Sequence, residues 1–246
     1  MAVRNIKFTV LYDGSRYHGW QVQPGLDTIQ QQLKRVAADL FGFEVDITGA
    51  SRTDAGVSAL GQSVLMQIDS PIPTENIAKA INHRLPDDIF ICDVEEVPEG
   101  FDVIGDVTSK MYRYSIYTGR IRPVLEITHC WHLPVELDIE SMNREAEVLI
   151  GQHDFKSFAS AADERTNSVR TIFRCNIASQ GDWVYIETEG DGFLYNMVRN
   201  IVGSLVEVGL RRWEAGKMKE VLEAKDRRAA GPIAPAGGLC LMWIKY

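Results

Sequence analysis

The chain has 246 residues, of which 45% are hydrophobic and 24% charged, and its formal net charge is −8. These values lie close to the globular average and exclude a chain that is disordered, collagen-like or coiled-coil throughout. Four scattered cysteines without a C-x-x-C pair argue against a zinc ribbon or a disulfide framework. Because no run approaches the ~18 apolar residues of a membrane span and the N-terminus does not resemble a signal peptide, we expect a cytoplasmic protein.

Strand and helix patterns alternate in the first half of the chain. Apolar residues at every second position of 5–12 predict a strand. Thr28 opens a capping box, and the apolar stripe that follows predicts a helix over 29–40. The remaining predicted elements are strands at 43–48, 62–68 and 89–97 and a helix over 74–85. This β-α-β-β-α-β order is ferredoxin-like and favours a largely antiparallel sheet.

The second half has a similar order of elements. Its predicted strands are 111–117, 169–177, 183–189 and 239–246, and its predicted helices are 138–150, 193–208 and 214–224. We therefore expect an α+β protein made of two ferredoxin-like halves with largely antiparallel sheets, which together form a central sheet and a cleft. The expected domains are 1–105 and 106–246.

A basic segment with interleaved aromatic residues extends from Thr108 to Arg122. It contains no acidic residue, and its basic and aromatic members are Lys110, Arg113, Arg120, Arg122, Tyr112, Tyr114 and Tyr117. Such a segment can bind phosphates and stack bases, although an ordinary strand with a charged solvent face has the same composition. The acidic net charge, taken alone, argues against nucleic-acid binding.

The loop over 49–60 surrounds one acid, Asp54, and one base, Arg52, with small residues. Small neighbours let a ligand approach the backbone closely, and loops on rigid sheets are common sites of chemistry. The alternative is a turn in which the Asp54 side chain binds its own backbone.

Arg199 interrupts a segment, 197–206, that is apolar on nearly every side and is predicted to form a buried helix. Because an arginine does not lose its proton, a buried guanidinium needs an anionic partner. Asp54 is one candidate, and Asp154 and Asp191 are two others. Alternatively, Arg199 reaches the surface at the start of the helix.

The loop sequence SRTDAGVSALGQ (51–62) resembles the catalytic loop of the tRNA pseudouridine synthase I family, the isomerases of uridines in the tRNA anticodon arm. Five further blocks match that family in order and approximate spacing. They are LYDGSRYHGWQ (11–21), MYRYSIY (111–117), GQHDFKSF (151–158), GFLYNMVRNIVGSLVEVG (192–209) and APAGGLCLMWIKY (234–246).

This resemblance implies a role for each of five residues. Asp54 takes the position of the catalytic aspartate, and Arg199 that of the arginine that pairs with it. Tyr112 matches the tyrosine that stacks on the target base, and Leu239 matches an apolar residue lining the pocket. Arg52 matches a position associated with RNA contact and with flipping of the base, which is necessary because a uridine inside a stem cannot be reached.

Three positions depart from the family pattern. Ser51 stands where the family usually has glycine, Ser58 where it usually has histidine, and Phe101–Ile104 where it usually reads F-H-A-R. These departures concern RNA docking rather than the three central residues of the site. Asp102 would repel phosphate if it faced the RNA.

The resemblance also implies partners and chemistry. It implies a homodimer that binds tRNA across both subunits and modifies uridines at positions 38 to 40. Because the product is an isomer, the reaction requires no redox cofactor, metal or energy donor. The aspartate either attacks a carbon directly or removes the C2′ proton, and both routes stay open. A neighbouring arginine would keep the aspartate charged.

Two other functions stay open from the sequence. One is an RNA-binding relative without turnover. The other is a hydrolase that uses Asp54 on a small substrate, although this would require a second carboxylate or a metal near the loop. The pair His129 and His132 lacks further ligands at zinc spacing, so we expect no metal.

Overall fold

The structure is a computed structural model that describes residues 3–163 and 165–246, and it divides the chain into two units. The first unit comprises Met1–Thr108 together with Leu241–Tyr246, and the second comprises Ser109–Cys240. The end of the chain thus returns to the N-terminal unit. Within the described ranges, no helix is long and apolar enough to cross a membrane.

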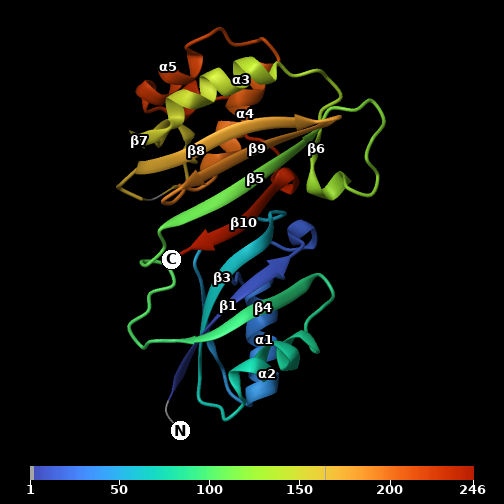
Figure 1. Cartoon of the computed structure of the whole chain (residues 1–246), viewed down its shortest axis with the longest axis vertical. Coiled ribbons are helices and arrows are strands. Elements are labelled where there is room, and N and C mark those ends of the chain that lie inside the picture. Colours follow the sequence, from blue (N-terminus) through green and yellow to red (C-terminus); the bar gives the residue numbers. More distant parts are fainter. Residues whose placement is uncertain (1–2, 164) are drawn as a thin grey trace. The chain divides into compact units, whose positions relative to one another are not determined.

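Two helices lie along an antiparallel sheet in the first unit (Figure 1). The helices are α1 (Ile29–Phe41) and α2 (Thr74–Asn82). The strands are β1 (Arg4–Tyr12), β2 (Asp46–Gly49), β3 (Ser58–Ile68) and β4 (Ile89–Val97). Strand β1 lies between β3 and β4, and β2 pairs with β3, each pair being antiparallel. The predicted β-α-β-β-α-β order is confirmed.

The sequence pattern explains these elements locally. Alternate residues of β1, among them Ile6, Phe8 and Val10, are almost fully buried. The Thr28 side chain accepts a hydrogen bond from the backbone N–H of Gln31 at 3.4 Å, so it caps α1 as its sequence predicts.

The second unit also has an antiparallel sheet with its helices on one face (Figure 1). The order of its main strands is β5 (Ser109–Tyr117), β9 (Trp183–Gly190), β8 (Val169–Gln180) and β7 (Gly151–Asp154), and β6 (Trp131–His132) pairs in parallel with β5. The helices are α3 (Ile139–Ala146), α4 (Met197–Gly209) and α5 (Lys217–Ala224). Strand β10 (Leu239–Lys245) closes the chain.

Several element ends differ from their predicted positions. Strand β3 begins at Ser58, four residues early, which shortens the loop that carries Asp54. Helix α4 begins at Met197 rather than at residue 193, because Asn196 adopts the left-handed conformation with φ 61° and interrupts the helix there. Arg199 therefore lies in the first turn of α4. The expected α+β class with largely antiparallel sheets is confirmed.

Candidate active site

Backbone hydrogen bonds hold the Asp54 loop against the segment that follows β1. The N–H of Trp20 donates to the carbonyl of Thr53 at 3.0 Å, and the N–H of Gly56 donates to the carbonyl of Tyr17 at 3.2 Å. These bonds lie on either side of Asp54 in the sequence. The position of the Asp54 backbone is therefore set by the chain immediately after β1.

The two backbones approach so closely that only glycine fits at two positions. A β-carbon at residue 14 would overlap the carbonyl oxygen of Val57, and one at residue 19 would lie 2.6 Å from the carbonyl oxygen of Thr53. Gly19 also has a positive φ of 89°, which disfavours any side chain there. The two glycines of DGSRYHG (13–19) therefore allow this segment to pack against a loop that lies about forty residues later in the sequence.

Two polar side chains that the sequence did not single out also support the loop. The Tyr12 hydroxyl and the Thr53 hydroxyl are hydrogen-bonded at 2.8 Å within the core. Gln62, which is completely buried, accepts from the N–H of Ser51 at 3.1 Å and donates to its carbonyl. Gln62 shares one face of β3 with the buried residues Val64, Met66 and Ile68, and a glutamine on this otherwise apolar face is the signal that could have identified the support.

Within the loop, Asp54 is partly buried and Arg52 is exposed. The arginine can therefore meet a large partner such as a nucleic acid, while Asp54 is less accessible. Their assignment as catalytic and RNA-contacting residues stays a prediction.

Two departures from the family pattern have structural roles here. The Ser58 hydroxyl accepts a hydrogen bond from the N–H of Gly14 at 3.0 Å and so helps to fix the neighbouring turn. The Asp102 carboxylate accepts from the N–H of Ile104 at 2.9 Å, and backbone donation from Gly105 and Ile104 lowers the pKa of Asp102. Asp102 therefore closes its own turn.

In the second unit, Tyr112 lies on β5 with 5% of its surface exposed. Its ring meets that of Phe193 edge-to-face, with the centroids 5.3 Å apart and the planes at 88°. Such a contact fixes the orientation of the tyrosine ring. Phe193 was not among the predicted site residues, although an aromatic residue next to a Gly-Asp-Gly turn is a visible signal.

Arg199 is partly exposed, and its guanidinium is held at the start of α4. It donates to the carbonyl of Ala234 at 2.8 Å and to the side-chain oxygen of Asn196 at 3.1 Å. The backbone of Pro232 fills the space beside Gly203, where a β-carbon would overlap the Pro232 carbonyl oxygen. Because Gly203 has no side chain, the segment from Pro232 to Ala234 can pack directly against α4.

The same segment leads to Leu239, which is 6% exposed at the start of β10. The Tyr114 hydroxyl donates to the carbonyl of Pro235 at 2.7 Å, and Gly238 packs against the Tyr114 ring. Arg199 and Leu239 are therefore held by one stretch of chain, residues 234–239. The structure assigns these two residues and Tyr112 to the second unit and Asp54 to the first.

The other acidic candidates for Arg199 have different partners. Asp154 accepts from the Ser168 hydroxyl at 2.5 Å and lies 3.2 Å from the Lys225 ammonium. Asp191 accepts from the N–H of Thr171 at 2.9 Å. The pairing of Arg199 with Asp54 stays a prediction.

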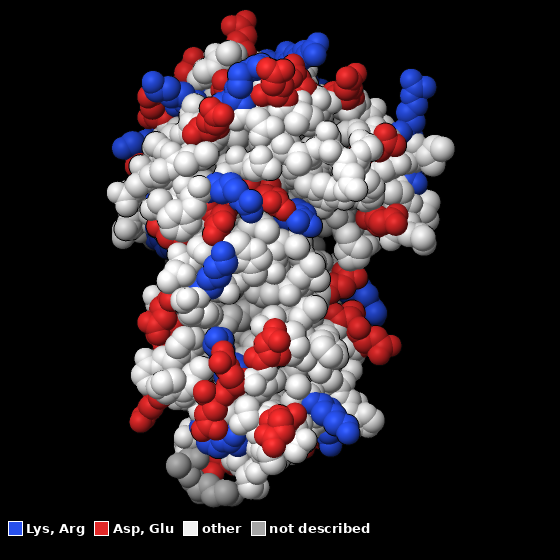
Figure 2. All heavy atoms as spheres, viewed as in Figure 1, with Lys and Arg blue, Asp and Glu red and all other residues white. Residues whose placement is uncertain are grey.

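The basic segment that begins at Thr108 does not form one continuous surface. Because successive side chains of a strand alternate between its faces, Lys110 and Arg113 lie on opposite faces of the sheet. Arg113 donates to Glu187 at 2.6 and 3.0 Å and lies over the Tyr185 ring. On the face shown in Figure 2, acidic and basic side chains are interspersed over each unit.

The His129 and His132 pair has no metal-binding arrangement. The His132 ring nitrogen Nε2 lies 2.9 Å from the Gly119 carbonyl. Across the part of the chain that the structure describes, no group of three or more His, Cys, Asp or Glu residues could hold a metal ion.

Comparison with known proteins identifies the family to which this chain belongs. A family profile described as tRNA pseudouridine synthase matches residues 9–104 and 146–246, which together make up well over half of the chain. The chain therefore belongs to the tRNA pseudouridine synthase family, a family of isomerases.

Among similar curated proteins is the tRNA pseudouridine synthase A of Acetivibrio thermocellus. It is 42% identical over 244 residues, which cover 99% of this chain and 100% of that protein. The proteins of the same name from Thermotoga neapolitana and Thermotoga maritima are 45% and 43% identical over 239 residues, which cover 96% of this chain and 97% of each relative. These alignments span nearly the whole chain, including the stretch around Tyr112 that lies between the two profile matches.

Proposed function

We propose that this chain converts uridine to pseudouridine in the anticodon arm of tRNA, at positions 38 to 40, with Asp54 as the catalytic carboxylate. The observation that supports this most directly is the Asp54 loop. In sequence it resembles the family's aspartate loop and lies within the matched range 9–104, and here its backbone is fixed by Trp20 and Tyr17 on both sides of the acid. A rigid loop holds a reacting carboxylate in one geometry.

The reaction exchanges one bond to the ribose for another. The bond between uracil N1 and ribose C1′ breaks, the base turns, and C5 forms the new bond to C1′. The proton on C5 is lost and N1 gains one, so the product has the same composition as the substrate. The ionised Asp54 either attacks the sugar or accepts the C2′ proton.

The remaining site residues keep the Asp54 carboxylate ionised and retain the detached base. Arg199 pairs with Asp54 and keeps that carboxylate ionised, since a cation favours the charged form of a neighbouring acid. Its fixed bonds to Ala234 and Asn196 orient the guanidinium for this contact. Tyr112 stacks on the detached base and Leu239 forms an apolar wall, so that the base stays in the pocket. Arg52 contacts the RNA and helps to flip the uridine out of the stem.

We further propose a cytoplasmic homodimer as the working form. In a dimer, basic side chains of both copies could contact one tRNA, so the acidic net charge of −8 on each chain need not prevent RNA binding.

Turnover on an unmodified tRNA transcript tests the proposal. Wild type should form pseudouridine, detected by nucleoside chromatography because the mass is unchanged. Asp54→Asn should form none while binding the transcript within a few-fold of wild type. The matched control is Asp46→Asn, which changes an exposed aspartate on β2 and should leave turnover unchanged.

Other outcomes identify the competing functions. Tight binding without product in wild type would reject the isomerase and support an RNA-binding relative. Release of free uracil or cleavage of the RNA would support a hydrolase. Full turnover by Asp54→Asn would reject Asp54 as the catalytic group.

A further inference from the structure

Three basic side chains, those of Lys110, Arg165 and Arg170, gather beside Phe193 in the second unit. We propose that Arg165 and Arg170 bind the RNA backbone phosphate next to the uridine whose base stacks on Tyr112. This inference rests on the proposed function and names a part of the substrate, a phosphodiester, that this pair of arginines recognises.

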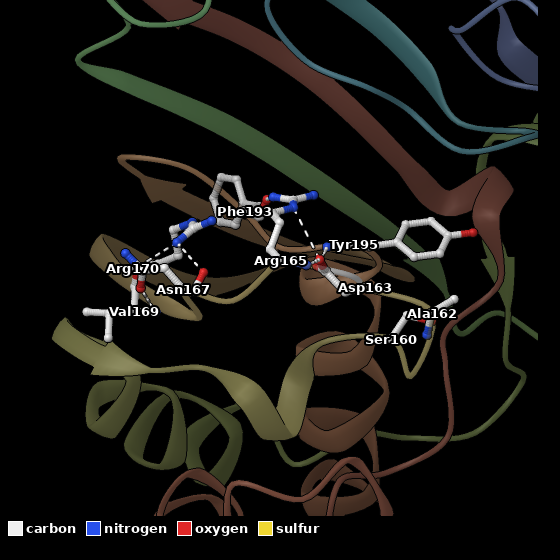
Figure 3. A network of polar contacts seen from close by, with 9 residues as sticks. All are labelled: Ser160, Ala162, Asp163, Arg165, Asn167, Val169, Arg170, Phe193 and Tyr195. Carbon is white, nitrogen blue, oxygen red and sulfur yellow. Dashed lines mark hydrogen bonds and ion pairs between the residues drawn. The ribbon is translucent and has the colours of Figure 1, made fainter.

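Arg165 is fixed at the aromatic pair by its own hydrogen bond. Its guanidinium donates to the Phe193 carbonyl at 2.9 Å, and Figure 3 shows it directed toward that residue. Phe193 in turn contacts the Tyr112 ring. Through Phe193, Arg165 is thus linked to the tyrosine on which the base is proposed to stack, and a group bound to Arg165 would lie near that base, as a flanking phosphate does.

Arg170 is held by neutral acceptors. It donates to the carbonyls of Val169 at 2.6 Å and Asn167 at 3.2 Å (Figure 3). Its side chain lies beside Gly192, the residue before Phe193: a β-carbon added to Gly192 would be 3.6 Å from the Arg170 Nε atom. Both of these hydrogen-bond partners of Arg170 are uncharged backbone carbonyls. Carbonyl oxygens orient the guanidinium without cancelling its charge.

Lys110, Arg165 and Arg170 lie close enough together for their positive charges to lower the pKa values of Lys110 and Arg170. Burial, followed by the charges of Arg165 and Arg170, lowers the pKa of Lys110 to about 8. Burial and the charge of Arg165 likewise lower the pKa of Arg170. Like charges held together in a partly buried place cost free energy, and a bound anion would offset that cost.

Two carboxylates face the cluster and partly balance it. Asp163 lies 3.2 Å from the Arg165 guanidinium and also accepts from the N–H of Tyr195 at 2.7 Å. Asp191 acts on Arg170 electrostatically but accepts its hydrogen bond from the Thr171 backbone. A guanidinium has five N–H donors, and the contacts given above engage Nη1 and Nε of Arg165 and Nη1 of Arg170, so both side chains keep donors for an added anion.

The salt dependence of tRNA binding tests this site. The probe is the unmodified transcript, bound at several salt concentrations. The double variant Arg165→Gln/Arg170→Gln should reduce the slope of log affinity against log salt by ~0.7–0.9, the value for one lost phosphate contact. The double variant Arg165→Lys/Arg170→Lys should keep the slope, because lysine retains the charge even where it loses the hydrogen bonds to Phe193 and Val169.

Controls separate this site from a structural role and from the proposed function. Arg144→Gln, which removes an exposed arginine on α3, should leave the slope unchanged. If the double glutamine variant does not fold, Arg170→Gln alone is measured in the same way. An unchanged slope in the glutamine variant, with wild type still binding and turning over, overturns this inference only. Absence of turnover in wild type overturns the proposed function instead.

Discussion

Gly14 lies directly against the carbonyl group of Val57, three residues after Asp54, and the two backbones leave no room for a β-carbon. This contact joins the turn after β1 to the loop that carries the acid. The hydrogen bond from the N–H of Gly14 to the Ser58 hydroxyl tightens the same junction. The geometry of the proposed catalytic loop therefore depends on a residue forty positions away.

Gly14→Ala should displace the Asp54 loop. The added methyl group must push away backbone atoms, and overpacking of this kind costs ~1–3 kcal/mol. We expect that loss in the free energy of unfolding, measured with denaturant, together with a large loss of turnover. Gly100→Ala is the control because no atom lies within 4 Å of its β-carbon position. Normal stability and turnover in Gly14→Ala would show that the junction is not needed.

Tyr112→Phe should keep tRNA affinity, because the phenylalanine ring retains both the stacking face and the edge-to-face contact with Phe193. Tyr112→Ala should weaken binding of the target region by ~1–3 kcal/mol, the value of one base–aromatic stack. Affinity and single-turnover rate are measured for each variant. Any rate lost in Tyr112→Phe reports on the hydroxyl, and equal losses in both variants would contradict a stacking role.

Arg199→Lys should lower turnover by about ten- to hundred-fold, since a charge-assisted hydrogen bond contributes ~1.5–3 kcal/mol. Lysine keeps the charge but lacks the planar fork with which Arg199 binds Ala234 and Asn196 and with which it is proposed to bind Asp54. Transcript affinity should change by no more than a few-fold. A Lys variant with wild-type turnover would mean that charge alone, without orientation, is sufficient at this position.

The affinity for tRNA should fall as the pH rises through about 8. Lys110, with its pKa lowered to about 8 by burial and by Arg165 and Arg170, loses its proton in this range in the folded chain. Fluorescence anisotropy between about pH 6.5 and 8.5 measures the effect. Lys110→Arg should remove most of the pH dependence, because arginine stays charged. A pH profile unchanged by this substitution would exclude Lys110 as the titrating group.

The same shift has the opposite effect on stability. The pKa of Lys110 is lower in the folded chain than its ordinary value of 10.5 in the unfolded chain. Between about pH 8 and 10.5 the unfolded chain therefore binds more protons, and the contribution of Lys110 to the free energy of unfolding rises with pH. Denaturant unfolding of wild type and Lys110→Met at pH 7.5 and 9.5 should show this rise in wild type only.

Much of the architecture follows from local patterns. The alternation in 5–12 and the capping box at Thr28 predicted β1 and α1 closely, because side-chain periodicity and capping act within a few residues. The start of α4 was predicted four residues early. Residues 193–195 are as apolar as the helix itself, and the left-handed conformation of Asn196 separates them from it.

The basic segment shows where composition is insufficient. Lys110 and Arg113 are three residues apart, yet the strand places them on opposite faces of its sheet. Arg113 is engaged by Glu187, a residue of the neighbouring strand. The cations that gather beside Phe193 come instead from β5, which carries Lys110, and from Arg165 and Arg170 before and at the start of β8, more than fifty residues away in the sequence.

By itself, the amino-acid sequence determined the order of elements, the α+β class and the loop that contains Arg52 and Asp54. These depend on periodicity and on short motifs, which are properties of neighbouring residues. Only the tertiary structure decided that Gly14 and Gly19 shape that loop, that Phe193 orients Tyr112, and that the end of β10 belongs with the first unit. Those contacts join residues far apart in the chain, and packing, rather than local preference, determines which of them form.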